Sequence, residues 1–140
     1  QMKIIKVEGA TGFLDTNFMG KAKAAVDAVN GDADFVYMHV EATDEAGHMG
    51  SSTEKIRAIE NLDKAVGYIL DNFDGVVMLL PDHPTPIVKK THTHDPVPFA
   101  VMGPGFAADE CQCYSEKECS AKGAFGLMQA ADLLKTVFNN

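Results

Sequence analysis

The sequence predicts an α/β fold, a three-layer α/β/α sandwich built around a mostly parallel sheet. Compact apolar runs typical of buried strands alternate along the chain with segments in which apolar residues recur every three or four positions, as in amphipathic helices. No internal repeat or low-complexity linker interrupts this alternation. With 140 residues, of which 46% are hydrophobic, the chain is long enough to form one domain with its own core.

The first strand, the first helix and a second strand are expected within the first 40 residues. Residues 2–7 mix isoleucine and valine with lysine, which suits a short strand. Asp15 or Thr16 is placed to cap the helix that follows. Residues 34–40 then form a compact apolar run, which predicts a strand buried on both faces. The helix between these strands has one apolar face, formed by Phe18, Ala22, Ala25, Val26 and Val29.

The central part of the chain predicts a loop, a long helix and another strand. Residues 41–50 are expected as the loop, and Ser51 with Glu54 has the capping-box spacing that starts a helix. This helix is expected to end near Asn72, and residues 76–80 follow as a buried strand. The buried stripe of the helix is expected to consist of Ile56, Ile59, Leu62, Val66, Ile69 and Phe73.

The last third of the chain predicts one more strand and one more helix. Residues 87–90 extend briefly, and residues 97–102 are expected as the strand. A polar loop follows to about Lys122, and residues 124–138 are expected as the last helix. The polar loop carries Cys111, Cys113 and Cys119, for which reduced thiols are favoured over a thiolate metal site because the loop holds no histidine as a fourth ligand. The apolar side of the helix is formed by Phe125, Met128, Ala131, Leu134, Val137 and Phe138.

Composition and charge exclude several classes of function. A formal net charge of −8 and a sequence pI of about 4.9 give no electrostatic basis for binding nucleic acid. No apolar run approaches the roughly 20 residues of a transmembrane helix, so no membrane is expected as a partner. The first residues have the pattern of a strand rather than of a basic and apolar leader, and we therefore expect a cytoplasmic protein.

Imidazole and carboxylate groups gather between residues 35 and 99. Three short motifs in this stretch each pair histidine with a carboxylate beside glycine or proline: residues 44–48 (DEAGH), 81–86 (PDHPTP) and 91–95 (THTHD), the last followed by Pro96. They follow or precede predicted strands, and open α/β sheets bind ligands in loops at the carboxyl ends of strands. Mixed imidazole and carboxylate donors suit a divalent transition metal. The stretch holds all five histidines of the chain, His39, His48, His83, His92 and His94.

The spacing within these motifs indicates which side chains can reach the same ion. Asp44 and His48 are four residues apart, so a helical turn places both on one face, and a tight loop at the neighbouring glycine is an equal alternative. Asp82 and His83 are adjacent and follow a strand, so they can serve one ion or two, and His92 can reach either ion. Five such donors exceed what one tetrahedral ion takes from protein, whereas two ions roughly 3.5–4 Å apart are common in phosphoryl transfer.

Simpler interpretations stand beside the metal hypothesis. A single Asp–His pair is more often a hydrogen-bonded surface pair than a set of metal ligands. His39 lies inside a predicted strand and is expected as a core histidine or one that supports a ligand, and Glu41 is placed to orient a ligand. Exposure to water explains the remaining charged residues as well as a ligand role or a phosphate contact does: His94, Asp95, Lys89 and Lys90.

These motifs resemble a known family. Residues 39–48 (HVEATDEAGH), 80–86 (LPDHPTP), 91–93 (THT) and 95–99 (DPVPF) are similar to the cofactor-independent phosphoglycerate mutases of the archaeal type. Residues 9–16, 20–22 and 55–60 resemble that family as well, so that the likeness covers nearly the whole chain. The family belongs to the alkaline phosphatase superfamily of two-metal phosphoryl-transfer enzymes, which implies an alkaline-phosphatase-like α/β sandwich.

The resemblance implies a role for each metal motif. Asp44, His48 and His92 match the ligands of a first metal, and Asp82 and His83 match two ligands of a second. The second site is incomplete, because its further aspartate lies upstream of the matching segment in the family. The resemblance gives His94 and Asp95 no ligand role. Two divalent ions are expected in the family site, with Mn²⁺ favoured and Zn²⁺ and Mg²⁺ as alternatives.

The resemblance also implies an activity. A serine would accept phosphate from phosphoglycerate and return it to the other hydroxyl, interconverting 3-phosphoglycerate and 2-phosphoglycerate. In the family this serine and the substrate-gripping domain precede the segment matched here, and Ser51, Ser52 and Ser115 stand in the wrong context to replace the nucleophile.

We therefore expect residues 1–140 to be the C-terminal segment of a metal-binding, phosphatase-like catalytic domain, without a catalytic residue of its own and inactive alone. Its partners would be phosphoglycerate, in the full-length enzyme, and the N-terminal part of its own chain. The alternatives are a segment of another phosphatase or phosphomutase of the same superfamily and a non-catalytic metal-binding module.

Overall fold

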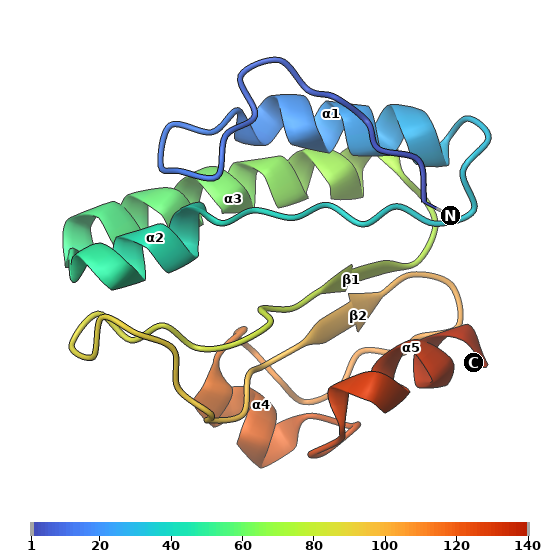
Figure 1. The fold of residues 1–140 in the computed structure, drawn as a ribbon. Coiled ribbons are helices and arrows are strands. Elements are labelled where there is room, and N and C mark those ends of the chain that lie inside the picture. Colours follow the sequence, from blue (N-terminus) through green and yellow to red (C-terminus); the bar gives the residue numbers. More distant parts are fainter. Residues whose placement is uncertain (1, 140) are drawn as a thin grey trace. The chain divides into compact units, whose positions relative to one another are not determined.

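The computed structural model describes residues 2–139, which contain five helices and two strands (Figure 1). The chain divides into two compact units. Unit 1 comprises the chain up to Phe73 together with Thr85–Thr93, and unit 2 comprises Asp74–Pro84 together with the chain from His94 onward. The α/β character expected from the sequence is therefore present.

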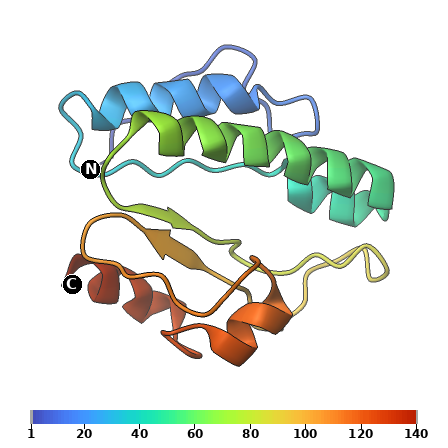
Figure 2. The ribbon, with the colours of Figure 1, turned by 180° about the vertical axis from the view of Figure 1, so that it is seen from behind.

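Three helices build unit 1: α1 (Phe18–Val29), α2 (Ala42–Met49) and α3 (Ser52–Asn72). α1 and α3 lie side by side, and α2 packs against α3 (Figure 1, Figure 2). The centre of the core consists of one phenylalanine and four alanines: Phe18, Ala22, Ala42, Ala58 and Ala65. The small alanine side chains allow the helices to approach one another closely. No helix within residues 2–139 combines the length and apolar character that crossing a bilayer requires.

Side-chain caps fix where α1 and α3 begin. Ser51 caps α3 as expected, because its hydroxyl accepts a hydrogen bond from the Glu54 N–H at 3.3 Å. The cap expected for α1 was wrong: Asn17, not Asp15 or Thr16, accepts from the Gly20 N–H at 2.8 Å. The expected residues are already engaged in the preceding turn, where the side chains of both accept hydrogen bonds from Thr11.

The stripe expected to be buried on α3 is only partly buried. Leu62 and Ile69 pack against the core, whereas the side chains of Ile56 and Ile59 are 57% and 51% exposed. α3 itself ends at Asn72, as the sequence predicted.

Residues 42–49 form the helix α2, where a loop over residues 41–50 was expected. α2 places Asp44 and Glu45 in its first turn, where carboxylates interact favourably with the helix dipole. It ends at Met49, and Gly50 follows with a φ of 71°, the left-handed conformation that glycine adopts without steric cost. Of the two geometries left open for residues 44–48, the helical turn is therefore the one observed.

Two of the expected strands do not form within the described residues. Residues 2–7 and 34–40 run without regular secondary structure and pair with no strand in that part of the chain. Met38 and Val40 pack against the core of unit 1, but Phe35 and Tyr37 are 44% and 65% exposed. The expectation of burial on both faces was therefore wrong, since only alternate side chains of this segment face the helices.

The only sheet of residues 2–139 lies in unit 2 and has two strands. β1 (Val77–Leu79) pairs antiparallel with β2 (Ala100–Met102), with Met78 opposite Val101. Both strands are shorter than expected, and their direction differs from that of a parallel sheet. The finer expectation of a mostly parallel three-layer sandwich is thus not confirmed by the described residues.

The last part of unit 2 forms α4 (Glu116–Lys122) and α5 (Ala130–Phe138), which both figures show on the β2 side of the strand pair (Figure 1, Figure 2). α4 lies where a loop was expected, and Ser115 caps it by accepting from the Glu118 N–H at 3.2 Å. α5 begins later than expected, because residues 124–129 turn at Gly126 with a φ of 61°.

Candidate metal centre

The first pair of candidate ligands lies on one face of α2. Asp44 and His48 are one helical turn apart, and the Nε2 atom of His48 lies 3.2 Å from Oδ2 of Asp44. Both side chains are partly buried, with 28% and 37% exposed. The helix therefore delivers one carboxylate and one imidazole to the same point, as the four-residue spacing requires.

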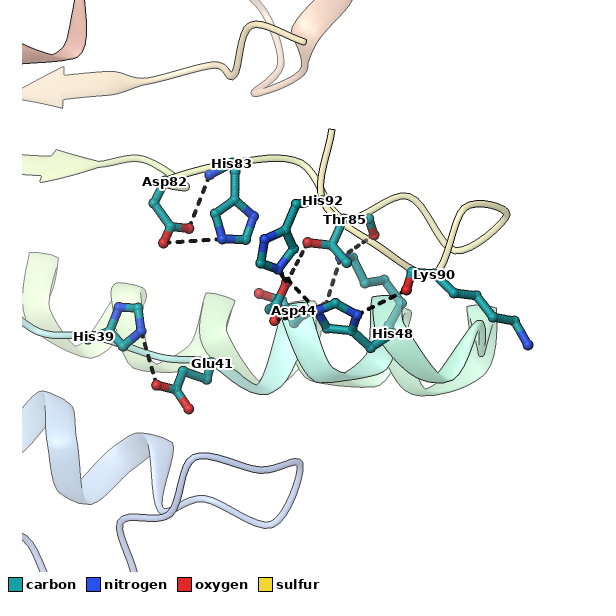
Figure 3. Close-up of polar contacts among 11 residues, drawn as sticks. His39, Glu41, Asp44, His48, Asp82, His83, Thr85, Lys90 and His92 are labelled. Atoms are coloured by element: carbon teal, nitrogen blue, oxygen red, sulfur yellow. Dashed lines mark hydrogen bonds and ion pairs between the residues drawn. The ribbon is translucent and has the colours of Figure 1, made fainter. Parts of the chain in front are cut away.

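His92 comes to the same point from residues Thr85–Thr93 of unit 1 (Figure 3). Its Nε2 atom lies 3.5 Å from Oδ1 of Asp44 and 3.1 Å from Nε2 of His48. Two imidazole nitrogens and two carboxylate oxygens thus face one another within unit 1. Donors of this kind match the ligands that divalent transition metals take in proteins, so the residues present fit such an ion.

A backbone carbonyl orients the His48 ring. Nδ1 of His48 lies 3.0 Å from the carbonyl oxygen of Lys90, which can only accept a hydrogen bond (Figure 3). We therefore assign the proton to Nδ1, which leaves the lone pair of Nε2 facing Asp44 and His92. Lys90 has a φ of 55°, and it is the only non-glycine residue with positive φ within residues 2–139. This backbone conformation directs its carbonyl towards the ring.

Two further side chains hold Asp44 and its surroundings. The hydroxyl of Thr85, a buried residue, donates to Oδ1 of Asp44. The ammonium of Lys55 donates to the carbonyl oxygens of Thr43 at 2.7 Å and of Thr85 at 3.4 Å. Burial lowers the pKa of Lys55, and the nearby Asp44 carboxylate opposes that shift. The cluster therefore combines a carboxylate with a partly buried cation.

Gly47 lets the Thr85 segment approach α2. A β-carbon at position 47 would overlap the Thr85 carbonyl oxygen and lie 2.9 Å from its Cγ2. Because Gly47 has no side chain, the Thr85 backbone packs directly on the helix that carries Asp44 and His48.

The second candidate pair lies in unit 2, just after β1. The His83 N–H donates to Oδ1 of Asp82 at 3.1 Å, and its Nε2 lies 3.5 Å from Oδ2 of the same carboxylate (Figure 3). The two adjacent side chains thus turn towards each other rather than to opposite faces. That they hold a second ion stays a prediction.

The remaining candidates lie outside the Asp44 cluster. His39 is exposed rather than part of the core, and its Nε2 lies 3.5 Å from Oε1 of Glu41 (Figure 3). Glu41, which was expected to orient a ligand, instead pairs with this ring. His94 and Asp95 are exposed, in agreement with their expected contact with water.

Comparison with known proteins now identifies the family. A family model described as the metalloenzyme superfamily matches residues 1–140. The chain belongs to this superfamily. Membership of the metalloenzyme superfamily implies that a divalent metal is bound, and the donors around Asp44 are of the type required.

Relatives within the metalloenzyme superfamily support the resemblance found in the sequence. The chain is 45% identical over 139 residues to the 2,3-bisphosphoglycerate-independent phosphoglycerate mutase of Methanothrix thermoacetophila, covering 95% of this chain and 35% of that protein. It is 39% identical to the enzyme of the same name from Ignicoccus hospitalis, covering 99% of this chain and 33% of the relative. The chain thus spans about a third of the length of the curated relatives it matches.

A solved structure shares the fold. The PH0037 protein from Pyrococcus horikoshii superimposes with a TM-score of 0.93 at 36% sequence identity, and the match covers 98% of this chain and 42% of that protein. The fold of this chain is therefore shared with a solved protein, and the likeness to the phosphoglycerate mutases comes from the sequence relatives.

Sequence reasoning missed three residues that support the cluster. Thr85 lies inside the 81–86 motif, and its position between two prolines was a signal that could have singled it out. Lys55 and the backbone of Lys90 carried no comparable signal, because a helical lysine and a backbone carbonyl have no distinctive pattern in a sequence.

Proposed function

We propose that this chain is the metal-binding C-terminal part of a phosphoglycerate mutase that interconverts 3-phosphoglycerate and 2-phosphoglycerate through a phosphoserine. Asp44, His48 and His92 would hold the first divalent ion. The observation that carries the proposal is the convergence of these three side chains on one point, with a carbonyl leaving Nε2 of His48 available. The relatives named as phosphoglycerate mutases supply the reaction.

Each residue of the cluster has a task in this proposal. Thr85 fixes the Asp44 carboxylate, Lys90 fixes the His48 ring, and His92 closes the ligand set from a second segment. An ion bound there would supply a Lewis acid that stabilises negative charge on a phosphoryl group. Phosphoryl transfer depends mainly on such positioning and charge stabilisation, so a preformed ligand set is what the chain contributes.

A second divalent ion would be held by Asp82 and His83, together with an aspartate that this chain does not contain. The support is the family resemblance and the presence of both donor types in adjacent positions. We propose Mn²⁺ for both sites, with Zn²⁺ and Mg²⁺ as alternatives that the donor types also accept. Since two protein ligands are fewer than a stable site normally has, we expect weak binding at the second site.

The rest of the proposed enzyme would complete the domain. We propose that the three-layer sandwich with its mostly parallel sheet forms only with the N-terminal part of the same protein, which would also bring the nucleophilic serine and the phosphoglycerate-binding domain. The exposure of Phe35 and Tyr37, on an extended segment that joins no sheet within residues 2–139, supports this proposal. A cytoplasmic location stays a prediction.

Metal binding by the 140-residue chain tests the proposed first site. We expect His48→Ala to weaken Mn²⁺ binding at least about tenfold in titration calorimetry, because one of three ligands is lost. His94→Ala is the matched control, since His94 is exposed and lies outside the cluster, and it should leave the affinity unchanged. Unchanged affinity in both variants would remove the first site.

Activity assays test the proposed enzyme. The isolated chain with Mn²⁺ should convert no 3-phosphoglycerate, whereas the same segment joined to the N-terminal part of a relative should do so. Turnover by the isolated chain would contradict the proposal that the N-terminal part supplies the nucleophilic serine. Conversion of other phosphate esters, but not phosphoglycerate, by the joined protein would favour another phosphatase or phosphomutase of the superfamily.

A further inference from the structure

Lys55 links the two segments that carry the proposed ligands of the first metal. It lies in the first turns of α3, next to α2 but not on it. Its ammonium donates to the Thr43 carbonyl in the first turn of α2 and to the Thr85 carbonyl at the start of the segment that carries His92. These two hydrogen bonds join α3 to both segments.

We propose that Lys55 is a positioning residue: its ammonium holds residues 85–93 against α2 and thereby sets the spacing between His92 and the Asp44–His48 pair. This inference rests on the proposed function, because it assigns the residue a task in the proposed metal site. Lys55 would not be a ligand itself, since an ammonium group has donors and no acceptor.

The chemistry of lysine suits this task. An ammonium group has three N–H donors, and here two of them reach backbone carbonyls from segments about 40 positions apart in the chain. Burial lowers the pKa of Lys55, and the nearby Asp44 carboxylate opposes that shift, so the partly buried ammonium has a neighbour of opposite charge. A neutral, apolar side chain of similar length would fill the same space without holding either carbonyl.

Two effects of opposite sign act on a divalent ion at this site. The positive charge of Lys55 repels the ion, so its removal alone would strengthen binding. The loss of its hydrogen bonds would loosen the His92 segment, and changes in residues that orient ligands typically weaken metal affinity about 10- to 100-fold. We infer that the second effect dominates, because the ammonium donates to one backbone carbonyl in each of the two segments that carry the ligands.

The same helix offers a matched control. Lys64 also lies on α3, is exposed, and donates at 3.4 Å to the Asn61 side chain of the same helix. Lys64→Met therefore removes the same charge from the same helix without releasing either segment. Lys55→Arg keeps a cation with several donors, so it should retain much of the Mn²⁺ affinity that Lys55→Met loses.

The decisive experiment measures Mn²⁺ dissociation constants of the 140-residue chain and its variants by titration calorimetry. We expect Lys55→Met to raise the constant at least about tenfold, Lys55→Arg to raise it less, and Lys64→Met to leave it unchanged. Equal or tighter Mn²⁺ binding by Lys55→Met, with a circular dichroism spectrum like that of the parent chain, would overturn the proposal.

A metal-free measurement separates this inference from the proposed function. The N–H groups of Lys89 and Lys90 donate to the Pro86 carbonyl at 2.9 Å, so their amide hydrogen exchange reports the order of the His92 segment. Exchange there should be faster in Lys55→Met than in Lys64→Met. If the parent chain binds no Mn²⁺, the proposed metal site is rejected, but the exchange comparison still tests whether Lys55 positions the His92 segment. Equal exchange rates in the two variants would reject that positioning role.

Discussion

The Nδ1 atom of His48 lies 3.0 Å from the carbonyl oxygen of Lys90, although 42 positions separate the two residues in the chain. The contact depends on the backbone of Lys90, whose φ is 55°. The side chain of Lys90 lies over Gly50, which is itself left-handed, so that two residues with positive φ meet where α2 ends. The backbone conformation of Lys90 thus determines which ring nitrogen of His48 carries the proton.

The conformation of Lys90 can be tested with two variants that differ by one carbon atom. Lys90→Gly and Lys90→Ala both remove the side chain, but only alanine keeps the β-carbon that makes φ of 55° unfavourable. We expect the glycine variant to be more stable than the alanine variant by about 1 kcal/mol in urea unfolding. Equal stability of the two variants would show that residue 90 does not hold the left-handed conformation in solution.

The hydroxyl of Thr85 should matter for metal binding more than its volume. Thr85→Val keeps the shape of the side chain and removes the donor to Asp44, so the carboxylate loses its orientation. We expect Mn²⁺ affinity to fall about tenfold, the lower range for residues that orient a ligand. Thr85→Ser retains the hydroxyl and serves as the control in the same calorimetric titration. A serine variant as weak as the valine variant would indicate that packing, not the hydrogen bond, is responsible.

Local signals in the sequence predicted the long helix and most of the cluster. Ser51 and Glu54 determine the start of α3 through a hydrogen bond between residues three positions apart. A pattern as short as this can be recognised in a single sequence. Asp44 and His48 were correctly paired because a helical turn depends only on spacing. His92 was grouped with them only through motif chemistry and family resemblance.

The errors fall where distant contacts decide the structure. Residues 34–40 have the composition of a buried strand, but a strand requires a partner backbone, and none pairs with them among residues 2–139. α2 was taken as a loop because its glycine lowers helix propensity, and the close packing against Thr85 that requires this glycine is not visible in sequence. The tie from Lys55 to both segments was missed for the same reason.

The cysteines of unit 2 should differ in reactivity. Burial and the neighbouring Asp109 side chain raise the pKa of the Cys111 thiol to about 11, whereas Cys113 is exposed. At pH 8 a thiol with a pKa of about 11 is roughly one-thousandth thiolate, the form that reacts. Iodoacetamide should therefore modify Cys113 before Cys111.

The pH dependence of this reaction provides a second comparison. Between pH 8 and pH 10 the rate at Cys111 should rise about tenfold per pH unit, because the thiolate fraction does. Peptide mass mapping at timed intervals measures both sites, and chain unfolded in urea serves as the control, since it should lose the difference. Equal rates at the two cysteines in the folded chain at pH 8 would contradict the raised pKa of Cys111.

Substitution by alanine should have opposite effects on stability at two glycines that lie in helices. A β-carbon at Gly67 of α3 would meet no atom within 4 Å, so Gly67→Ala should gain up to about 1 kcal/mol of stability from higher helix propensity. A β-carbon at Gly47 would meet the Thr85 carbonyl, which belongs to the backbone and cannot rotate aside as a flexible side chain does. We expect Gly47→Ala to lose about 1–3 kcal/mol in urea unfolding despite the same gain in propensity. The displaced segment also carries His92, so Gly47→Ala should lower Mn²⁺ affinity together with stability, whereas Gly67→Ala should leave the affinity unchanged. If Gly47→Ala were as stable as Gly67→Ala, the Thr85 segment would not pack on α2.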